Sequence, residues 1–220
     1  MRLFDNFTET LSEVRRDLAE MSVNQELLNY GYTVRLPRLE DLPGLDGVWA
    51  AAEWIDRLNG VHSLPSNPGT SYLKKEELRE KFTEMETEAE SQHDMAVFPY
   101  TYSERLAIRQ QVFRVIRELS RDKASTDCYV SIWDPSQDAQ RIGCSGVPRS
   151  LGYHFVERAG RVHLTHLLRF SSFGTHFQDD AWLALKLLHF VCGETGKDPG
   201  RFSQFINVLS CNKGDIAGVF

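Results

Sequence analysis

Hydrophobic residues recur at helical spacing in two parts of the N-terminal half. Within residues 6–21 they return every three or four positions, and Asn6 and Glu9 stand in a capping-box arrangement, which predicts an amphipathic helix. A second helix is expected from Val48 to Gly60. The segment between them, from Asn29 to Gly47, is interrupted by prolines and glycines, so we expect only a short extended stretch there. Residues 71–92 are rich in Glu and Lys and predict a solvated helix.

The C-terminal half alternates between helical and strand patterns. Apolar spacing predicts a helix over 109–121, and β-forming residues predict a strand over 128–133. Two further strands, 150–156 and 162–168, are joined by a short turn, which predicts a β-hairpin. A strongly apolar helix over 181–192 follows, with Asp179 or Asp180 as its N-cap and glycines at its end. Helices and strands mix without a regular βαβ period, which indicates an α+β fold with a mixed sheet and packed helices.

Composition limits the size and the surroundings of the protein. A chain of 220 residues with 41% hydrophobic side chains is expected to form one domain, residues 1–220. Its formal charge of −6 gives no general attraction for nucleic acid, and its Lys and Arg residues look scattered. No apolar run is long enough to span a bilayer, and residues 1–20 do not resemble a signal peptide. We therefore expect a cytoplasmic protein that binds neither nucleic acid polymers nor membranes.

Cysteine and histidine positions argue against disulfides and metals. The four cysteines, at 128, 144, 192 and 211, form no C-x-x-C pair, so reduced thiols are expected. His163 and His166 are three residues apart on a predicted strand, where alternation should place them on opposite faces of the sheet. We expect no metal site.

Three segments resemble the thymidylate synthase family, particularly its short archaeal forms. They are Tyr100-Thr101-Tyr102-Ser103-Glu104-Arg105-Leu106, Val130-Ser131-Ile132-Trp133-Asp134-Pro135, and Pro148-Arg149 followed by the hairpin that ends at Leu168-Arg169. Twenty residues separate Arg149 from Arg169, and eleven separate Arg169 from Asp180. The resemblance covers roughly the C-terminal half and implies the thymidylate-synthase-like α+β fold. It also implies a homodimer, because the family packs its large sheets back to back.

Several functional positions of the family are exchanged in this chain. Arg149 stands where the family has its nucleophilic cysteine, and a guanidinium cannot attack a pyrimidine. Thr126-Asp127 replaces the arginine pair that reaches the nucleotide phosphate of the partner subunit. Ser210 and Asn212 replace a His and a Tyr that hold the ribose, and Ser172 replaces an aspartate near the folate. The resemblance therefore names the fold more securely than the reaction.

Several residues are nevertheless candidates for a site. The resemblance gives Arg149, Arg169, Asp180, Ser210 and Asn212 as substrate-binding candidates. Asp180 takes the place of the base-reading asparagine, as in relatives that act on cytidylate, or it is an ordinary helix cap. Arg169, on an otherwise apolar strand, is expected to bind an anion or a buried carboxylate.

The candidate catalytic residues are Tyr102 and Cys144. Tyr102 lines the cavity or packs in the core. Cys144 lies five residues before Arg149 and is an alternative nucleophile or an inert loop residue.

Two functions remain open from the sequence. One is a protein that binds a cytosine-type pyrimidine nucleotide or nucleoside and carries out a modified one-carbon transfer or another reaction on it, with 5,10-methylenetetrahydrofolate as the implied cofactor. The other is a non-catalytic relative that uses the fold as a ligand-binding or scaffold partner. Both expect a small pyrimidine ligand and a homodimer.

Overall fold

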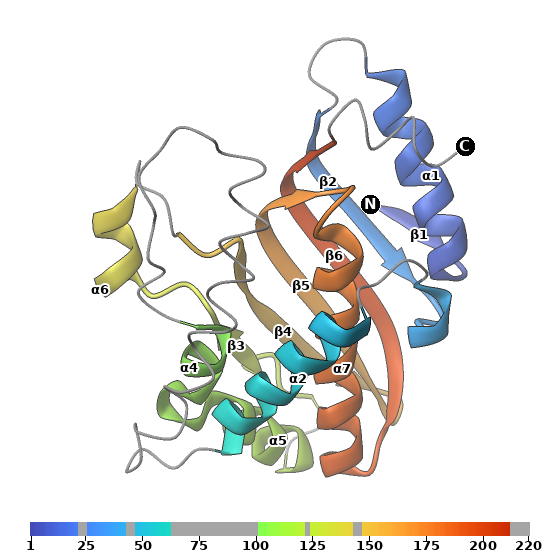
Figure 1. Cartoon of the computed structure of the whole chain (residues 1–220). Helices are drawn as coiled ribbons and strands as arrows, with labels where there is room; N and C mark the ends of the chain where they lie inside the picture. Colours follow the sequence, from blue (N-terminus) through green and yellow to red (C-terminus); the bar gives the residue numbers. More distant parts are fainter. Residues whose placement is uncertain (22–25, 43–46, 63–100, 122–123, 143–146, 212–220) are drawn as a thin grey trace.

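One mixed six-stranded sheet organises the protein (Figure 1). The computed structural model describes residues 1–21, 26–42, 47–62, 101–121, 124–142 and 147–211. The strand order is β1-β2-β6-β5-β4-β3, with bounds β1 Arg2–Phe4, β2 Glu26–Val34, β3 Tyr129–Ser131, β4 Ser150–Arg158, β5 Arg161–Ser172 and β6 Asp198–Ser210. The helices are α1 Phe7–Glu20, α2 Gly47–His62, α4 Tyr102–Ala107, α5 Gln111–Arg121, α6 Pro135–Asp138 and α7 Phe177–Thr195. The expected α+β class is confirmed.

The centre of the sheet is a hairpin followed by a helical crossover. Strands β4 and β5 are antiparallel and turn through Ala159 and Gly160, whose φ angles of 54° and 79° are those of a type I′ turn. Strand β6 then returns parallel to β5 after α7. His163 and His166 do face opposite sides of the sheet. His166 is buried beneath the helices, while His163 is half-buried and accepts from the Arg201 main-chain N–H at 2.9 Å.

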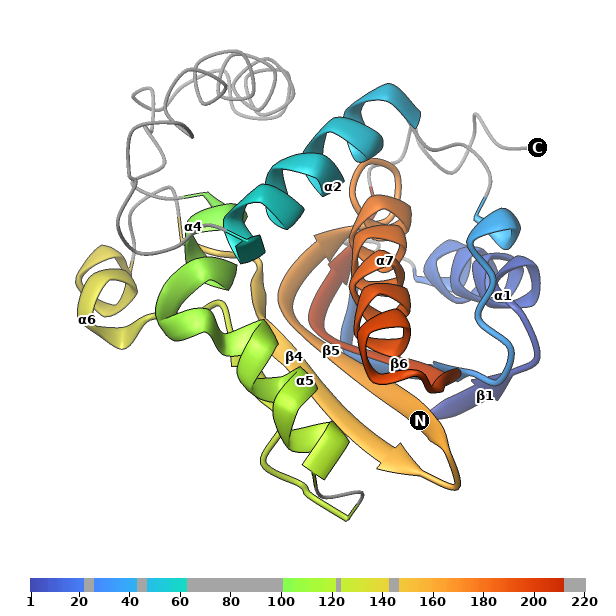
Figure 2. The ribbon, with the colours of Figure 1, turned by 90° about the horizontal axis from the view of Figure 1, so that it is seen from below.

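Helix α7 lies along the face of β5 and β6, and α2 crosses over α7 (Figures 1 and 2). The buried residues of α1, α5 and α7 join those of the strands in one hydrophobic core cluster. Helix α1 begins where the sequence predicts, because Asn6 Oδ1 accepts from the Glu9 N–H at 2.9 Å. Within the described residues, no helix has the length and apolar character needed to cross a membrane.

The inward and outward alternation of side chains shifts by one residue across three neighbouring strands. Ile206 and Leu209 of β6 are both buried although they are three residues apart, and their partners on β5, Leu168 and Ser171, are buried as well. On β2 the partners Tyr30 and Leu27 pack against the same core. Strand β4 has its own irregularity between Ser150 and Gly152. Such irregularities bend a sheet and redirect its side chains.

The sheet face away from the core carries an apolar patch on both sides of this shift. Leu28, 69% exposed, lies beside Val208, which lies beside Phe170. One row further, Phe205, 38% exposed, lies between Gly31 and Leu167. We call these five apolar side chains, Leu28, Leu167, Phe170, Phe205 and Val208, the open-face patch.

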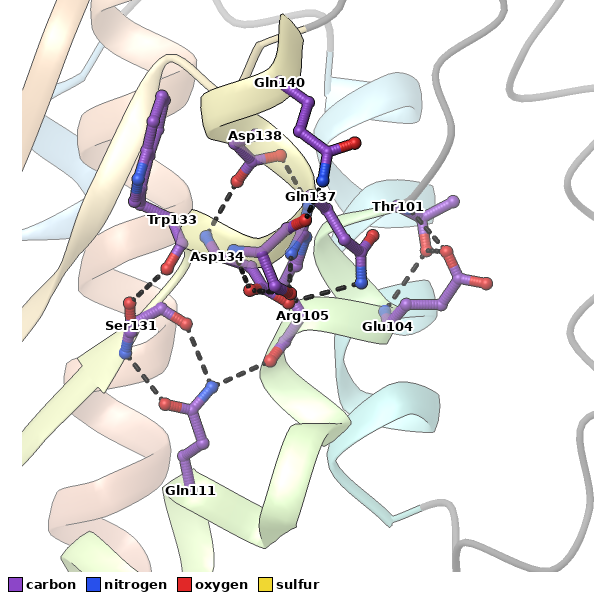
Figure 3. Close-up of polar contacts among 11 residues, drawn as sticks. Thr101, Glu104, Arg105, Gln111, Ser131, Trp133, Asp134, Gln137, Asp138 and Gln140 are labelled. Carbon is purple, nitrogen blue, oxygen red and sulfur yellow. Dashed lines mark hydrogen bonds and ion pairs between the residues drawn. The ribbon is translucent and has the colours of Figure 1, made fainter.

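A buried ion-pair cluster fixes the segment that follows β3 (Figure 3). The guanidinium of Arg105, which is 1% exposed, lies 2.7 Å from Asp138 Oδ1 and 3.2 Å from Asp134 Oδ2. Asp138 is fully buried, and its Oδ2 also accepts from the Asp134 N–H at 2.7 Å. The cluster holds α4 against α6. Two of the segments that resemble thymidylate synthases, the one with Arg105 and the one with Trp133-Asp134-Pro135, are therefore in contact.

Strand β3 is shorter than predicted, because its regular pairing with β4 stops at Ser131, after which the N–H groups of Ile132 and Trp133 both donate to the Leu151 carbonyl. A side chain pairs with the outer edge of the strand at the same residue. The Ser131 N–H donates to Gln111 Oε1 at 2.8 Å, and Gln111 Nε2 donates to the Ser131 carbonyl at 2.9 Å. The strand ends at Ser131 and not at Trp133.

Three other expectations change. Helix α7 begins four residues earlier than predicted, at Phe177, and Asp179 and Asp180 lie in its first turn, so neither is its N-cap. Strand β2 is a full nine-residue strand, since pairing with the central β6 overrides the turn-forming residues near it. The helix expected over 71–92 lies outside the described residues.

The Arg105 cluster should dominate the stability of this end of the sheet. The Asp138→Ala variant leaves a buried guanidinium without its closest carboxylate, so the free energy of unfolding should fall by about 3–5 kcal/mol in urea denaturation. The exposed Arg121–Glu118 pair is the control, and Glu118→Ala should cost less than about 1 kcal/mol. Similar losses in the two variants would contradict this account.

Candidate ligand-binding site

Arg149 lies where the ionisable groups of several elements converge. It immediately precedes β4, and its carbonyl accepts from the Arg169 N–H of β5 at 2.8 Å. Burial raises the pKa of Asp180 and of Tyr102, and the positive charge of Arg149 opposes the rise in both. Burial, together with the positive charge of Arg149, lowers the pKa of His176 to about 3. Nε of Arg149 is buried and hydrogen-bonds to no atom of the described residues.

Asp180 faces this cluster from the first turn of α7. Its Oδ2 accepts from Ser171 Oγ at 3.0 Å, and Ser171 points inward only because β5 shifts its alternation just before it. Burial raises the pKa of the carboxyl, while Arg149, Ser171 and Arg57 favour its ionised form. Burial, the largest influence, and these partners therefore act in opposite directions on the pKa of Asp180, and the net result is a rise.

Arg57 of α2 connects the other side of the cluster. Its Nε donates to Glu53 Oε1 at 2.6 Å, and its Nη1 donates to the Tyr153 hydroxyl at 3.2 Å. The guanidinium also lies over the Tyr102 ring, 4.4 Å from the centroid. Burial raises the pKa of Glu53 in spite of Arg57. Two guanidinium groups, Arg57 and Arg149, thus share this buried region with two carboxyls, Glu53 and Asp180.

A hydrogen-bonded row crosses the four strands β4, β5, β6 and β2 beneath these groups. His166 Nε2 lies 3.0 Å from Ser150 Oγ, and its Nδ1 lies 3.0 Å from Gln204 Nε2. Gln204 Oε1 accepts from the Tyr32 hydroxyl at 2.7 Å, which orients the amide so that its Nε2 donates to His166. His166 also stacks on Tyr153 with ring centroids 4.6 Å apart. Burial lowers its pKa to about 3, so His166 is neutral. Its Nε2–H therefore donates a hydrogen bond to Ser150 Oγ.

The predicted site residues divide into two groups. Tyr102, Arg149 and Asp180 come together, and the Tyr102 hydroxyl accepts from the Ser150 N–H at 3.3 Å. Arg169 is exposed and donates to the carbonyls of Val147 and Pro148, each at 3.4 Å, so it holds the segment before Arg149. Among the described residues, no carboxylate forms an ion pair with Arg169. Its role toward a substrate stays a prediction.

Ser210 is the last residue of β6 and lies beyond the shift in side-chain alternation between Ile206 and Leu209. Its carbonyl accepts from the Phe173 N–H at 2.8 Å, which ties the end of β6 to the turn before α7. Cys144 and Asn212 lie outside the described residues.

The three described cysteines, Cys128, Cys192 and Cys211, are buried. Burial raises the pKa of Cys192 to about 12, which makes it a poor nucleophile. Among the described residues, no group of three or more His, Cys, Asp or Glu side chains is arranged to hold a metal ion.

The sequence reasoning missed Glu53, Arg57, Tyr153, His166 and Gln204. A signal existed for the first two, because a Glu and an Arg four apart on an apolar helix form an ion pair and must be buried together when the helix is covered. His166 and Gln204 occupy inward positions of their strands, but their partnership depends on strand register, which the sequence does not specify.

Comparison with known proteins supports the resemblance over part of the chain. Two curated proteins, one from Methanosarcina acetivorans and one from Methanosarcina barkeri, are named "Putative thymidylate synthase", and the chain is 31% and 30% identical to them over 129 residues. Over that stretch, the chain is similar to thymidylate synthases. The match spans 57% of this chain and 57% of the length of each relative. No model of a protein family matches the chain.

The neutral His166 should make stability depend on pH. Its pKa is about 3 in the folded protein, against an ordinary value of 6.5, so the unfolded chain binds the proton first as the pH falls. The free energy of unfolding should therefore decrease from about pH 6.5 toward pH 3, a trend that His176 shares in sign.

The variant His166→Gln isolates the contribution of His166. Glutamine keeps polar atoms that can reach Ser150 and Gln204 but cannot bind a proton in this range. Urea denaturation between pH 3 and 7 should show a shallower pH dependence in the variant. The same slope in both proteins would show that His166 is not the titrating group.

Proposed function

We propose that this chain binds a pyrimidine nucleotide or nucleoside of the cytosine type at the cluster around Arg149 and Asp180. The observation that carries the proposal is the Arg149 side chain, which brings a positive charge among Asp180, Tyr102 and His176 while its buried Nε has no hydrogen-bond partner in the described residues. Buried polar atoms normally have partners, so a ligand atom is the natural acceptor. Similarity to the two Methanosarcina proteins supports a thymidylate-synthase-like substrate class.

Asp180 favours cytosine over uracil. Cytosine presents an amine donor beside a ring nitrogen that accepts, whereas uracil presents a carbonyl oxygen beside an N–H. An ionised carboxylate accepts from the amine of cytosine, whereas the carbonyl oxygen that uracil presents at the same place offers it no donor.

A modified one-carbon transfer at this site would need a nucleophile, and Cys144 is the proposed one. The described thiols are buried, and Arg149 cannot replace a thiolate. These two observations favour the second candidate function, a relative that binds its ligand without catalysis. The two functions share the binding site and differ only in the reactivity of Cys144.

The folate cofactor also stays a proposal. Ser172, at the end of β5, offers a hydroxyl where the resemblance places an aspartate, so the residue at this position does not fit the usual folate contact. We therefore derive no step of a reaction through 5,10-methylenetetrahydrofolate.

We further propose that the chain forms a homodimer through the open-face patch. Leu28 and Phe205 are exposed at the centre of a sheet face whose neighbours Leu167, Phe170 and Val208 are only half-buried. Contiguous apolar side chains on a sheet face favour association with another surface. The same patch on a second copy gives a symmetric contact, which is the commonest arrangement in homo-oligomers.

Base preference tests the proposed ligand. In calorimetry with cytosine and uracil nucleosides and monophosphates, the wild-type protein should bind the cytosine ligands more tightly. Asp180→Asn should weaken their binding about tenfold or more, since a charge-assisted hydrogen bond is lost, and should favour the uracil ligands.

Glu194→Gln is the matched control, because it removes an exposed carboxylate from the far end of the same helix. It should leave both affinities unchanged. If wild type and Asp180→Asn bind the two bases equally, Asp180 does not read the base. If a reduced folate is added and changes neither affinity, the cofactor proposal fails separately.

A substitution that introduces a charge into the open-face patch tests the proposed dimer. Phe205→Glu would bury a carboxylate between two sheets, so the variant should sediment as a monomer while the wild type sediments as a dimer. Ile55→Glu places the same charge on an exposed position of α2 and should leave the mass unchanged. A monomeric wild type, or a Phe205→Glu variant that remains dimeric, would rule out this interface.

A further inference from the structure

A basic groove runs between α5 and the edge strand β3, away from the Arg149 cluster. Its volume is about 450 Å³. Both elements lie at the β3 end of the sheet (Figure 1). Four arginines line the groove: Arg109, Arg114, Arg117 and Arg121. Among the described residues, its lining carboxylates are Glu118 and Asp127. The chain as a whole has a formal charge of −6, whereas the side chains that line this groove carry a net positive charge.

Most of this positive charge is not neutralised within the groove. Arg121 donates to both oxygens of Glu118, at 3.1 and 2.8 Å. Arg109, Arg114 and Arg117 are exposed and form no hydrogen bond or ion pair with another residue that the structure describes. Three guanidinium groups are therefore available to a ligand.

The position of these groups is fixed by the core. Val112, Val115 and Leu119 on the other face of α5 are buried, so the helix cannot rotate about its axis. Arg114, Arg117 and Arg121 are three, four and seven residues apart and therefore project from one helical face. The Lys and Arg residues look scattered in the sequence, but helical spacing brings these three arginines to one face of α5.

The groove is suited to a ligand that side chains recognise, not to an added strand. Gln111 already occupies both main-chain groups of Ser131 on the edge strand β3. An incoming strand would find these groups taken. The partly exposed ring of Tyr129 and the buried Val115 and Cys128 add apolar surface beside the arginines.

We propose that this groove binds the phosphate chain of a nucleoside di- or triphosphate. The guanidinium fork matches phosphate oxygens in pairs, and several guanidinium groups together match a chain of several phosphates. A volume near 450 Å³ is that of a small-molecule site. Glu118 and Asp127 in the wall disfavour a long polyanion, although single-stranded nucleic acid carries the same phosphate chemistry.

Titration with inorganic tripolyphosphate, a nucleoside triphosphate and a single-stranded oligonucleotide tests the proposal. The wild type should bind the first two at low ionic strength, and binding should weaken as salt is added. The double variant Arg114→Gln/Arg117→Gln should weaken tripolyphosphate binding at least tenfold, because two charge-assisted contacts are lost. Both positions are exposed, and an unchanged melting temperature would verify folding.

Two controls locate the site. Arg16→Gln removes an exposed arginine from α1, at the other end of the sheet, and should bind tripolyphosphate like the wild type. Arg149→Gln should also bind it normally. Loss of binding in Arg149→Gln but not in the groove variant would overturn the proposal, as would a wild type that does not bind tripolyphosphate. Tighter binding of the oligonucleotide than of the triphosphate would replace the small ligand by a nucleic acid strand.

Discussion

The one-residue shift in the alternation of β2, β6 and β5 determines which side chains this protein can use. On each strand two inward residues stand three apart, and they are register partners across the sheet, so the shift is continuous from strand to strand. Without it, Ser171 would point away from α7 and Asp180 would lose its hydroxyl donor. The same shift leaves Leu28 and Val208 on the outer face next to Phe205. One backbone feature therefore shapes both the candidate site and the open-face patch.

Arg149 determines what the site can do more than how the site is built. Its positive charge lies near Asp180 and opposes the rise that burial causes in the pKa of that carboxyl. Arg57 has the same relation to Glu53 on the other side of the cluster. Each buried carboxyl is thus balanced by a guanidinium, and the cluster as a whole is close to neutral. Such a site suits recognition of a polar, uncharged ring by hydrogen bonds, while attack on that ring would need a nucleophile from elsewhere.

The fold and part of the site were predictable from the sequence, for identifiable reasons. Local signals placed α1, α2, α5 and the β4–β5 hairpin, since caps, apolar spacing and the Ala159-Gly160 turn act over a few residues. Strand β2 was not predicted at full length, because its stability comes from pairing with β6, more than 170 residues away along the chain. Tyr102, Arg149 and Asp180 were named through the resemblance. Their connection to Arg57 and His166 required the register and the packing of α2, which no local pattern contains.

Two of the segments that carry the resemblance, around Arg105 and Asp134, contain side chains whose single exchange is costly. Arg105 and Asp138 are both buried, and removal of one partner leaves an uncompensated charge that costs about 3–5 kcal/mol. Trp133-Asp134-Pro135 is fixed for the same reason, since Asp134 both caps α6 and joins this cluster. Arg149 and Ser172 are only partly buried, so other side chains can stand there at much lower cost. Physical constraint thus preserves the framework around the cluster, while the residues that would meet a ligand are free to differ, and similarity in the framework supports the fold more strongly than it supports the reaction.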